Sequence, residues 1–318
     1  MPVRLGRYDI LLRPRSRDAH IARTHRLKLG YKAHRTTPPR RTLRLFLILF
    51  PGHPLRVPNS LTCLPRSPAL FYTREEEWEG VRSATFTFSN NCEHTVWPGL
   101  LASAGSSPLA STGFQLDKGE TKSMSAPNGW SGRFWGRTLC SADSSGKFSC
   151  ATGDCGSGTM ECSGRGATPP ATLAEFTLNG SGGMDFYDAS LVDGYNLPML
   201  VVPQGGTGGG NSTCTTTGCL VDLNGLCPSE LKVTSSGEGV ACKSACEAFG
   251  KDEYCCSGAY SNPNTCQPTS YSQFFKNACP RAYSYAYDDG TSTFTCPGGI
   301  SYLITFCPTT ARYQLINR

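Results

Sequence analysis

Histidine is almost missing from the larger part of this 318-residue chain, because residues 84–318 contain only His94. A Ser-His-Asp or Cys-His nucleophilic arrangement needs a histidine as its base. His94 stands in "NCEHTVWPG", where we expect a loop after the first strand, so we give it no catalytic role. The paired C-x-x-C spacing of zinc sites is also absent. These gaps argue against a histidine-dependent hydrolase and against a zinc site, and we expect no metal and no cofactor.

Long apolar runs are missing as well. The run Leu45 to Phe50 has six residues, far fewer than the roughly 20 of a membrane-spanning helix. Arg40 and Arg41 precede it, as in a secretory signal. An h-region needs roughly 7 to 15 apolar residues, so this run does not demonstrate a signal peptide. "GGTGGGNST" lacks the lysine of a phosphate-binding loop, and we interpret it as a surface loop.

Charge is divided unevenly along the chain, and the overall +6 conceals this. Residues 1–83 hold 17 Lys and Arg against 6 Asp and Glu, a net of +11, whereas residues 84–318 hold 13 against 18, a net of −5. The basic head, residues 1–83, has no sustained apolar period and is predicted to be disordered. A nucleic-acid-binding arm is one interpretation. The change of sign favours a signal or targeting region or a mispredicted start, and we expect no nucleic-acid partner.

Cysteine, by contrast, is abundant. Cys63 stands alone, and the other 16 of the 17 cysteines lie between Cys92 and Cys307. This even number, without zinc-type spacing, indicates disulfides, which persist in oxidising compartments, so we expect a secreted protein. The sequons at Asn179 and Asn211 are candidate glycosylation sites and agree with secretion.

From residue 84 onward the sequence has the texture of an all-β protein. Short segments rich in Thr, Val, Phe and Tyr are broken by Gly, Pro, Asn and Ser. In "ATLAEFTLNG", Ala174 and Phe176 fall on one face of a strand and Glu175 on the other. Strands with one apolar and one polar face pack as sandwiches.

Two regions are dominated by closely spaced cysteines. "GKFSCATGDCGSGTMEC" is a loop of tight turns, and "CPSELKVTSSGEGVACKSACEAFGKDEYCC" includes a predicted short helix around Val240 to Phe249. We expect the latter region to lack a core of its own. We therefore divide residues 84–318 into a β-sandwich core (84–137, 164–220 and 280–318), a small disulfide loop (138–163) and a disulfide-rich lobe (221–279).

Several motifs together resemble the thaumatin-like protein family, the osmotin and thaumatin type of plant pathogenesis-related proteins. The stretch beginning at Gly146 fits its pattern G-x-[GF]-x-C-x-T-[GA]-D-C, and "DFYDASLVDGYNLPM", "CPSEL", "YCCSGAY" and "CPRAYSYAYDD" follow in the family's order. The likeness covers residues 84–318. It implies an eleven-stranded thaumatin-type β-sandwich, with the disulfide-rich lobe facing it across a cleft.

The resemblance also implies a disulfide pairing that spacing alone leaves open. The implied pairs are Cys92-Cys307, Cys140-Cys150, Cys155-Cys162, Cys214-Cys296, Cys219-Cys279, Cys227-Cys242, Cys246-Cys255 and Cys256-Cys266. No partner is implied for Cys63.

Five residues match the family's cleft by motif position: Arg133, Glu175, Asp188, Asp193 and Asp288. Arg137, Asp185 and Asp289 are close neighbours of these positions and are the alternative candidates. The set carries a formal charge of −3, and ionised carboxylates accept hydrogen bonds from sugar hydroxyls. For the aspartates of "DFYD" and "LVDG" the alternative is a purely structural role in a turn, because Asp favours turns.

The resulting hypothesis is a secreted, monomeric, antifungal plant defence protein of the apoplast or vacuole that binds β-1,3-glucan of fungal walls. Carboxylates held together disfavour joint ionisation. A protonated Glu175 could then act as general acid, with Asp188 or Asp193 as base or nucleophile. Any endo-β-1,3-glucanase activity is expected to be weak or absent.

Two alternatives remain. One is a membrane-permeabilising antifungal or osmotic-stress protein without hydrolytic activity, which acts on fungal membrane proteins; the other is a hydrolase inhibitor. Aromatic side chains that could stack on sugars are Trp97, Trp130, Trp135, Tyr283, Tyr285 and Tyr287, of which we expect Trp97 and Trp135 in the core.

Overall fold

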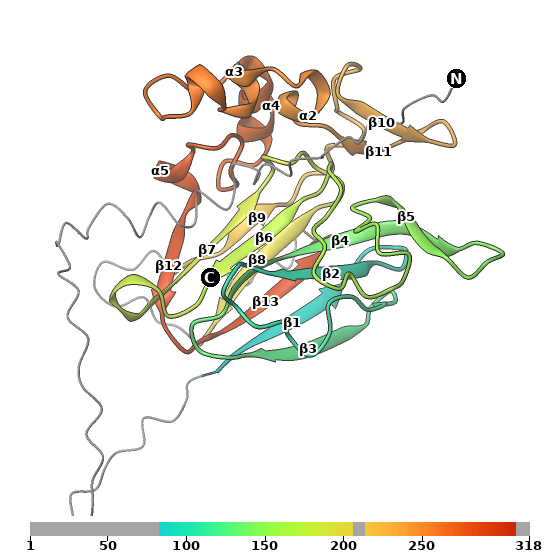
Figure 1. Cartoon of the computed structure of the whole chain (residues 1–318), viewed down its shortest axis with the longest axis vertical. Helices are drawn as coiled ribbons and strands as arrows, with labels where there is room; N and C mark the ends of the chain where they lie inside the picture. The colour runs from blue at the N-terminus through green and yellow to red at the C-terminus, as the bar shows by residue number, and fades with distance from the viewer. Residues whose placement is uncertain (1–82, 206–213, 310–318) are drawn as a thin grey trace, which may run out of the picture. The chain divides into compact units, whose positions relative to one another are not determined.

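The computed structural model describes residues 83–205 and 214–309 (Figure 1). The basic head up to residue 82, with Cys63, lies outside the described residues. So do Asn211 and most of the glycine-rich "GGTGGGNST" stretch. None of the helices in the two described ranges has the length and apolar character that crossing a bilayer requires.

Within these ranges, eleven strands form two sheets, and most of the pairing is antiparallel. We call them the β1 sheet, with order β3-β1-β13-β8-β9, and the β4 sheet, with order β12-β7-β6-β4-β2 and β5 paired to β4. β1 and β13 run parallel, so the first and last described strands lie side by side. The strands are β1 (Ala84–Asn90), β2 (Trp97–Ala102), β3 (Thr121–Ala126), β4 (Ser131–Ala142), β5 (Phe148–Thr152), β6 (Leu173–Thr177), β7 (Met184–Ser190), β8 (Met199–Gln204), β9 (Thr217–Cys219), β12 (Phe294–Pro297) and β13 (Ser301–Phe306).

Alternating side chains make the core between the two sheets. Phe86 and Tyr302 of the β1 sheet meet Phe134 and Phe176 of the β4 sheet in one buried cluster, with Phe86 4.7 Å from Phe134 between ring centroids. Edge-to-face aromatic pairs at such separations add to the stabilisation from apolar burial. The predicted all-β sandwich is confirmed, and Glu175 lies on the face of β6 opposite Phe176, as the alternation predicts.

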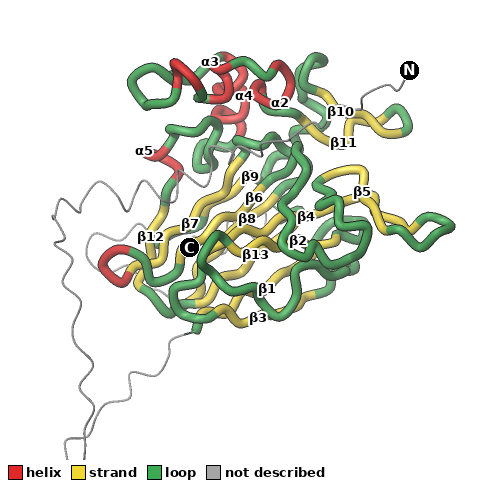
Figure 2. The backbone as a smooth tube through the Cα atoms, in the orientation of Figure 1, coloured by secondary structure: helices red, strands yellow, loops and turns green. Residues whose placement is uncertain are grey.

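The disulfide-rich lobe lies at one end of the sheets and consists of short helices and one two-stranded hairpin joined by loops (Figure 2). It contains β10 (Lys232–Ser235), β11 (Glu238–Cys242), α2 (Ala245–Phe249), α3 (Asp252–Cys255), η2 (Gly258–Tyr260) and α4 (Ser270–Ala278); η1 (Ser181–Gly183) and α5 (Asp289–Ser292) lie outside it.

The predicted helix from Val240 was wrong at its start. Val240 belongs to β11, and α2 begins at Ala245, where the Ser244 side chain caps the helix by accepting from the Glu247 N–H. A capping hydroxyl satisfies one of the first free backbone N–H groups, and this fixes where the helix begins.

The lobe packs on the sandwich through a shared apolar cluster. Leu191 and Tyr195, which follow β7, are buried together with Leu231 and Phe275 of the lobe. Tyr195 also pairs with Cys242 through backbone hydrogen bonds. The lobe therefore draws part of its core from the sandwich.

Eight disulfide bonds hold the described residues together, and they are the pairs that the family resemblance implied. Cys92–Cys307 links the segment after β1 to the segment after β13, over a sequence separation of 215 residues. Cys219–Cys279 links β9 to the end of α4. The others are Cys140–Cys150, Cys155–Cys162, Cys214–Cys296, Cys227–Cys242, Cys246–Cys255 and Cys256–Cys266.

Candidate functional site

Three of the predicted cleft residues form a row across the outer face of the β4 sheet. Arg133 on β4 lies opposite Glu175 on β6, and Glu175 lies opposite Asp188 on β7. The Arg133 Nη1 atom is 3.8 Å from Glu175 Oε1, and these two side chains are 18% and 17% exposed. We call Arg133, Glu175 and Asp188 the polar row.

The row is assembled by strand register. Ala174 and Phe176 on β6 and Tyr187 and Ala189 on β7 are buried, so Glu175 and Asp188 between them point to the other face. Antiparallel pairing then sets the two acidic residues directly opposite each other, where Cβ atoms lie about 4.5–5.5 Å apart. Like charges in that arrangement destabilise a sheet, and the Arg133 guanidinium offsets part of this cost.

Arg137 lies on the same face of β4 as the polar row, but its contacts are structural. Its side chain is fully buried, and it donates to the carbonyl oxygens of Trp97, Pro98 and Met160. Burial lowers its pKa to about 10. The small disulfide loop covers this end of the sheet and Arg137 holds it there, so of the two arginines only Arg133 lies in the polar row.

Asp185 faces the interior. It accepts hydrogen bonds from the Tyr302 hydroxyl and the Asn179 N–H, at 2.9 and 2.8 Å. Burial raises the pKa of its carboxyl. Strand parity places Asp185 on the opposite face from Asp188, so it is a core residue rather than a member of the row.

Asp193 lies in the turn after β7 and is half-buried. Its carbonyl oxygen accepts from the Ala171 N–H. Gly194 follows with φ +83°, and a Cβ there would lie 2.6 Å from the Cys242 carbonyl oxygen. Only glycine fits such a left-handed, crowded position, so this turn is pressed against β11 of the lobe.

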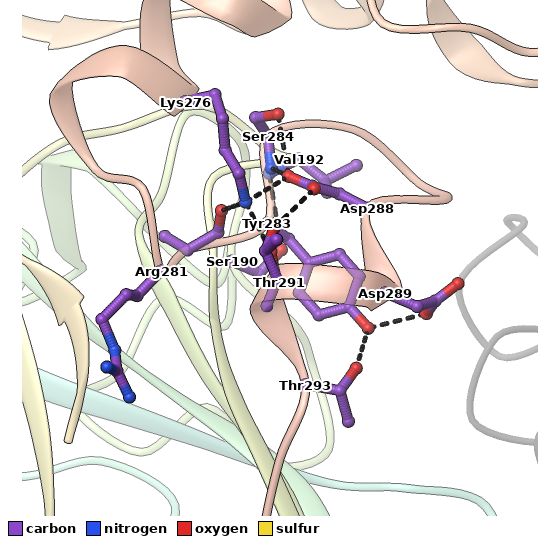
Figure 3. Close-up of polar contacts among 12 residues, drawn as sticks. Ser190, Val192, Lys276, Arg281, Tyr283, Ser284, Asp288, Asp289, Thr291 and Thr293 are labelled. Atoms are coloured by element: carbon purple, nitrogen blue, oxygen red, sulfur yellow. Dashed lines mark hydrogen bonds and ion pairs between the residues drawn. The ribbon is translucent and has the colours of Figure 1, made fainter. Parts of the chain in front are cut away.

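Asp288 forms an ion pair with a lysine of the lobe (Figure 3). One carboxylate oxygen lies 2.9 Å from the Lys276 ammonium on α4 and also accepts from the Ser284 N–H and hydroxyl. Lys276 donates as well to the Ala282 carbonyl and the Ser292 hydroxyl. Asp288 thus has its own counter-ion, and the other four predicted residues carry a formal charge of −2 rather than the −3 predicted for the full set.

Tyr283 and Asp289, unlike Asp288, lie at the Asp188 end of the polar row. The Tyr283 hydroxyl donates to Asp289 Oδ1 at 2.7 Å and contacts the Thr293 hydroxyl (Figure 3). Burial and then the charge of Asp188 raise the pKa of Tyr283, which places Asp188 within electrostatic reach of that phenol. Asp289 is therefore the better-placed of the two neighbouring aspartates to extend the row.

Neither Lys276 nor the hydrogen-bonding role of Tyr283 was predicted from the sequence. A lysine at the end of a short helix and a tyrosine in "YSYAYDD" have no distinctive spacing, and tertiary packing alone joins them to the acidic residues. Among the aromatic candidates, Trp130 and Trp135 are buried, as expected for Trp135. Trp97 is only half-buried, beside Phe148.

In the described ranges, no group of three or more His, Cys, Asp and Glu side chains is placed to hold a metal ion. The polar row can act as a set of hydrogen-bond acceptors beside one guanidinium donor. This is the equipment for recognising a hydroxylated ligand, and a pair of facing carboxylic acids is also the minimum for glycoside hydrolysis.

Comparison with known proteins agrees with the fold. The sequence matches the thaumatin family over residues 90–308, and the chain belongs to that family. It is 57% identical over 233 residues to thaumatin-like protein 1 of Pyrus pyrifolia, covering 73% of this chain and 94% of that protein.

Two further relatives have names that differ in kind. A glucan endo-1,3-beta-glucosidase of Prunus avium is 56% identical over 230 residues, covering 72% of this chain and 92% of that protein. Pathogenesis-related protein 5 of Arabidopsis thaliana is 57% identical over 228 residues, with the same coverage of 72% and 92%. The resemblance predicted from the motifs is confirmed.

Proposed function

We propose that this chain is a secreted plant defence protein that binds β-1,3-glucan of fungal cell walls along the polar row. The observation that carries the proposal is the direct opposition of Glu175 and Asp188 on neighbouring strands. Facing carboxylates weaken a sheet, so a purely structural role explains them poorly. A ligand that donates hydroxyl groups to both would relieve the repulsion.

Four further observations support the proposal. Asp193 is close in sequence to the row and held in a turn fixed by Gly194, and Arg133 supplies a donor at the other end. Eight disulfides suit an oxidising, extracellular location. A relative more than half identical is named as a glucan endo-1,3-beta-glucosidase.

Weak hydrolysis is part of this proposal. Glu175 would act as general acid and Asp188 as the facing carboxylate. The separation of the two carboxyl groups in the complex would decide the stereochemistry, because about 5–5.5 Å implies retention and about 6.5–9.5 Å implies inversion of the anomeric configuration.

Sedimentation with insoluble β-1,3-glucan tests the binding claim. We expect wild type to co-sediment, and Asp188→Asn to bind less because it removes an ionised acceptor. Glu238→Gln, an exposed change on β11 of the lobe, is the matched control and should bind as wild type does. Equal binding by wild type and Asp188→Asn, or no binding by wild type, would contradict the proposal.

A further inference from the structure

The tip of the β6–β7 hairpin carries a modification motif that the polar row does not use. Asn179, Gly180 and Ser181 form an N-x-S sequon, the triplet to which N-linked glycans are attached. β6 ends at Thr177 and β7 begins at Met184, so the sequon lies in the connecting turn, together with η1. A sequon arises easily by chance, and only an accessible one can carry a glycan in the folded protein.

The turn is held by backbone contacts rather than by the Asn179 amide. The Asn179 N–H donates to Asp185 Oδ1 at 2.8 Å, and the Gly180 N–H donates to the Met184 carbonyl at 2.7 Å. Asn179 has φ +47°, a left-handed conformation that asparagine tolerates better than most residues. Both Asn179 and Ser181 are exposed. The fold therefore fixes the chain around the sequon and leaves its two functional side chains in solvent.

The Asn179 amide nitrogen differs from those of the asparagines that hold the fold. Asn90, Asn196 and Asn224 each donate through Nδ2 to a backbone carbonyl oxygen. In the part of the chain that the structure describes, the Nδ2 atom of Asn179 donates no hydrogen bond. Its Oδ1 atom lies over the turn, 3.4 Å from where a Cβ on Gly298 would be. The nitrogen can therefore take a large substituent without the loss of a contact in the fold.

The hairpin tip lies at the end of the sandwich opposite the lobe, where Figure 2 shows η1 as the red turn beside β12. At the other end of the same hairpin, Ser190 pairs with Tyr283 next to the lobe. Glu175 and Asp188 lie between these ends, and Asn179 follows Glu175 by four residues. A glycan on Asn179 therefore covers the far end of the sandwich and leaves open the side of the polar row that faces the lobe.

We propose that Asn179 is a site of N-linked glycosylation. The proposal goes beyond the proposed function and shares with it only the passage through the secretory route. The donor is an oligosaccharide on a lipid diphosphate. The bond between its anomeric carbon and Asn179 Nδ2 forms, the bond between that carbon and the diphosphate oxygen breaks, and the amide releases one proton.

The glycan also protects the turn. Exposed loop tips with small residues are preferred sites of proteolytic nicking, and this turn contains Gly180, Gly182 and Gly183. A bulky, hydrated substituent beside these glycines hinders the approach of a protease to their backbone.

Mass spectrometry of the full chain secreted from plant cells tests the proposal. The chain is produced with its own start and, separately, behind an added plant signal peptide. A glycopeptide amidase in heavy-oxygen water then converts a glycosylated asparagine to labelled aspartate. We expect the label at Asn179 and its loss in Ser181→Ala, an exposed change that should leave the fold intact. Ser181→Thr should keep the label, because threonine also completes the sequon.

Asn128 is the matched control within the chain. It is exposed and followed by glycine, as Asn179 is, but Trp130 stands where a sequon needs Ser or Thr. Spontaneous deamidation labels both Asn-Gly pairs with or without the amidase, whereas a glycan labels Asn179 alone and only when the amidase is added.

Two results overturn the proposal: an unmodified Asn179 in the protein made with the added signal peptide, or a label that Ser181→Ala retains. A glycan that appears only with the added signal peptide supports Asn179 as the acceptor and counts against secretion directed by residues 1–83. The failure of this site and the failure of the proposed function are therefore distinguishable.

Discussion

The outer face of β4 carries two arginines, four residues apart, in different environments. Around Arg137, the small disulfide loop covers the sheet, buries Trp135 and accepts hydrogen bonds from the guanidinium. Around Arg133, the sheet stays partly open and the guanidinium faces Glu175 at 3.8 Å. Whether a loop covers the strand, rather than the residue type, separates a structural arginine from one available to a ligand.

The same contrast separates the acidic residues. Asp185 is locked to Tyr302 inside the sandwich and Asp288 to Lys276 of the lobe, whereas Glu175 and Asp188 face each other at the surface. A carboxylate with its own donors is satisfied by the fold. The row sets two facing carboxyl groups beside one guanidinium, and this arrangement suits a ligand with several hydroxyl groups.

Replacing each arginine in turn by methionine should produce the largest difference in stability. Arg137→Met removes a buried guanidinium that donates to the carbonyl oxygens of Trp97, Pro98 and Met160, so we expect a loss of about 3 kcal/mol or more in the free energy of unfolding. Arg133→Met removes one long ion pair and should cost less than about 1 kcal/mol. Guanidinium chloride unfolding with the disulfides intact measures both. Equal losses would show that the two ends of the strand do not differ as described.

Asp288 should matter mainly for stability, and Asp289 mainly for glucan binding. Asp288→Asn breaks the pair with Lys276, and we expect it to cost about 1–2 kcal/mol of stability while glucan binding falls little. Asp289→Asn, at an exposed position, should change stability by less than about 0.5 kcal/mol and weaken glucan binding. The unfolding midpoint and a pull-down on the polymer separate the two effects. The reverse pattern would return Asp288 to the ligand site.

The buried Asp185 should give the smallest effect, visible in pH dependence. Its pKa is raised in the folded state, so the folded protein holds a proton that the unfolded chain releases above about pH 3.9. Its contribution to stability is therefore present at low pH and is lost as the pH rises through the folded pKa.

Asp185→Asn cannot titrate and should lack this part of the profile. Thermal unfolding between pH 3 and pH 7 should accordingly show a smaller decline with rising pH in Asp185→Asn than in wild type. Parallel profiles would mean that Asp185 titrates alike in both states.

Much of the fold was predictable because simple periodicity governs it. Alternation in "ATLAEFTLNG" placed Phe176 inside and Glu175 outside, and tertiary packing did not override it. The helix boundary near Val240 was missed because the strand β11 and the capping Ser244 occupy the positions before α2.

The candidate site was predictable in its strand residues and less so in its loops. Glu175 and Asp188 meet because register fixes them, and motif order was enough to find both. The partners of Asp288 and Asp289 depend on how α4 and the loop after it fold back on β7. No local pattern encodes the contact of Lys276 with Asp288.

The most direct test of the account is the response of glucan binding and hydrolysis to Glu175→Gln in the same preparation. A pull-down on β-1,3-glucan, run beside a reducing-sugar assay, compares this variant with wild type. We predict that wild type binds and releases little or no sugar, that Glu175→Gln binds more weakly because an amide replaces the carboxyl group that contacts the ligand, and that any release disappears. Undiminished binding and unchanged sugar release in Glu175→Gln would contradict the assignment of the polar row as the glucan site.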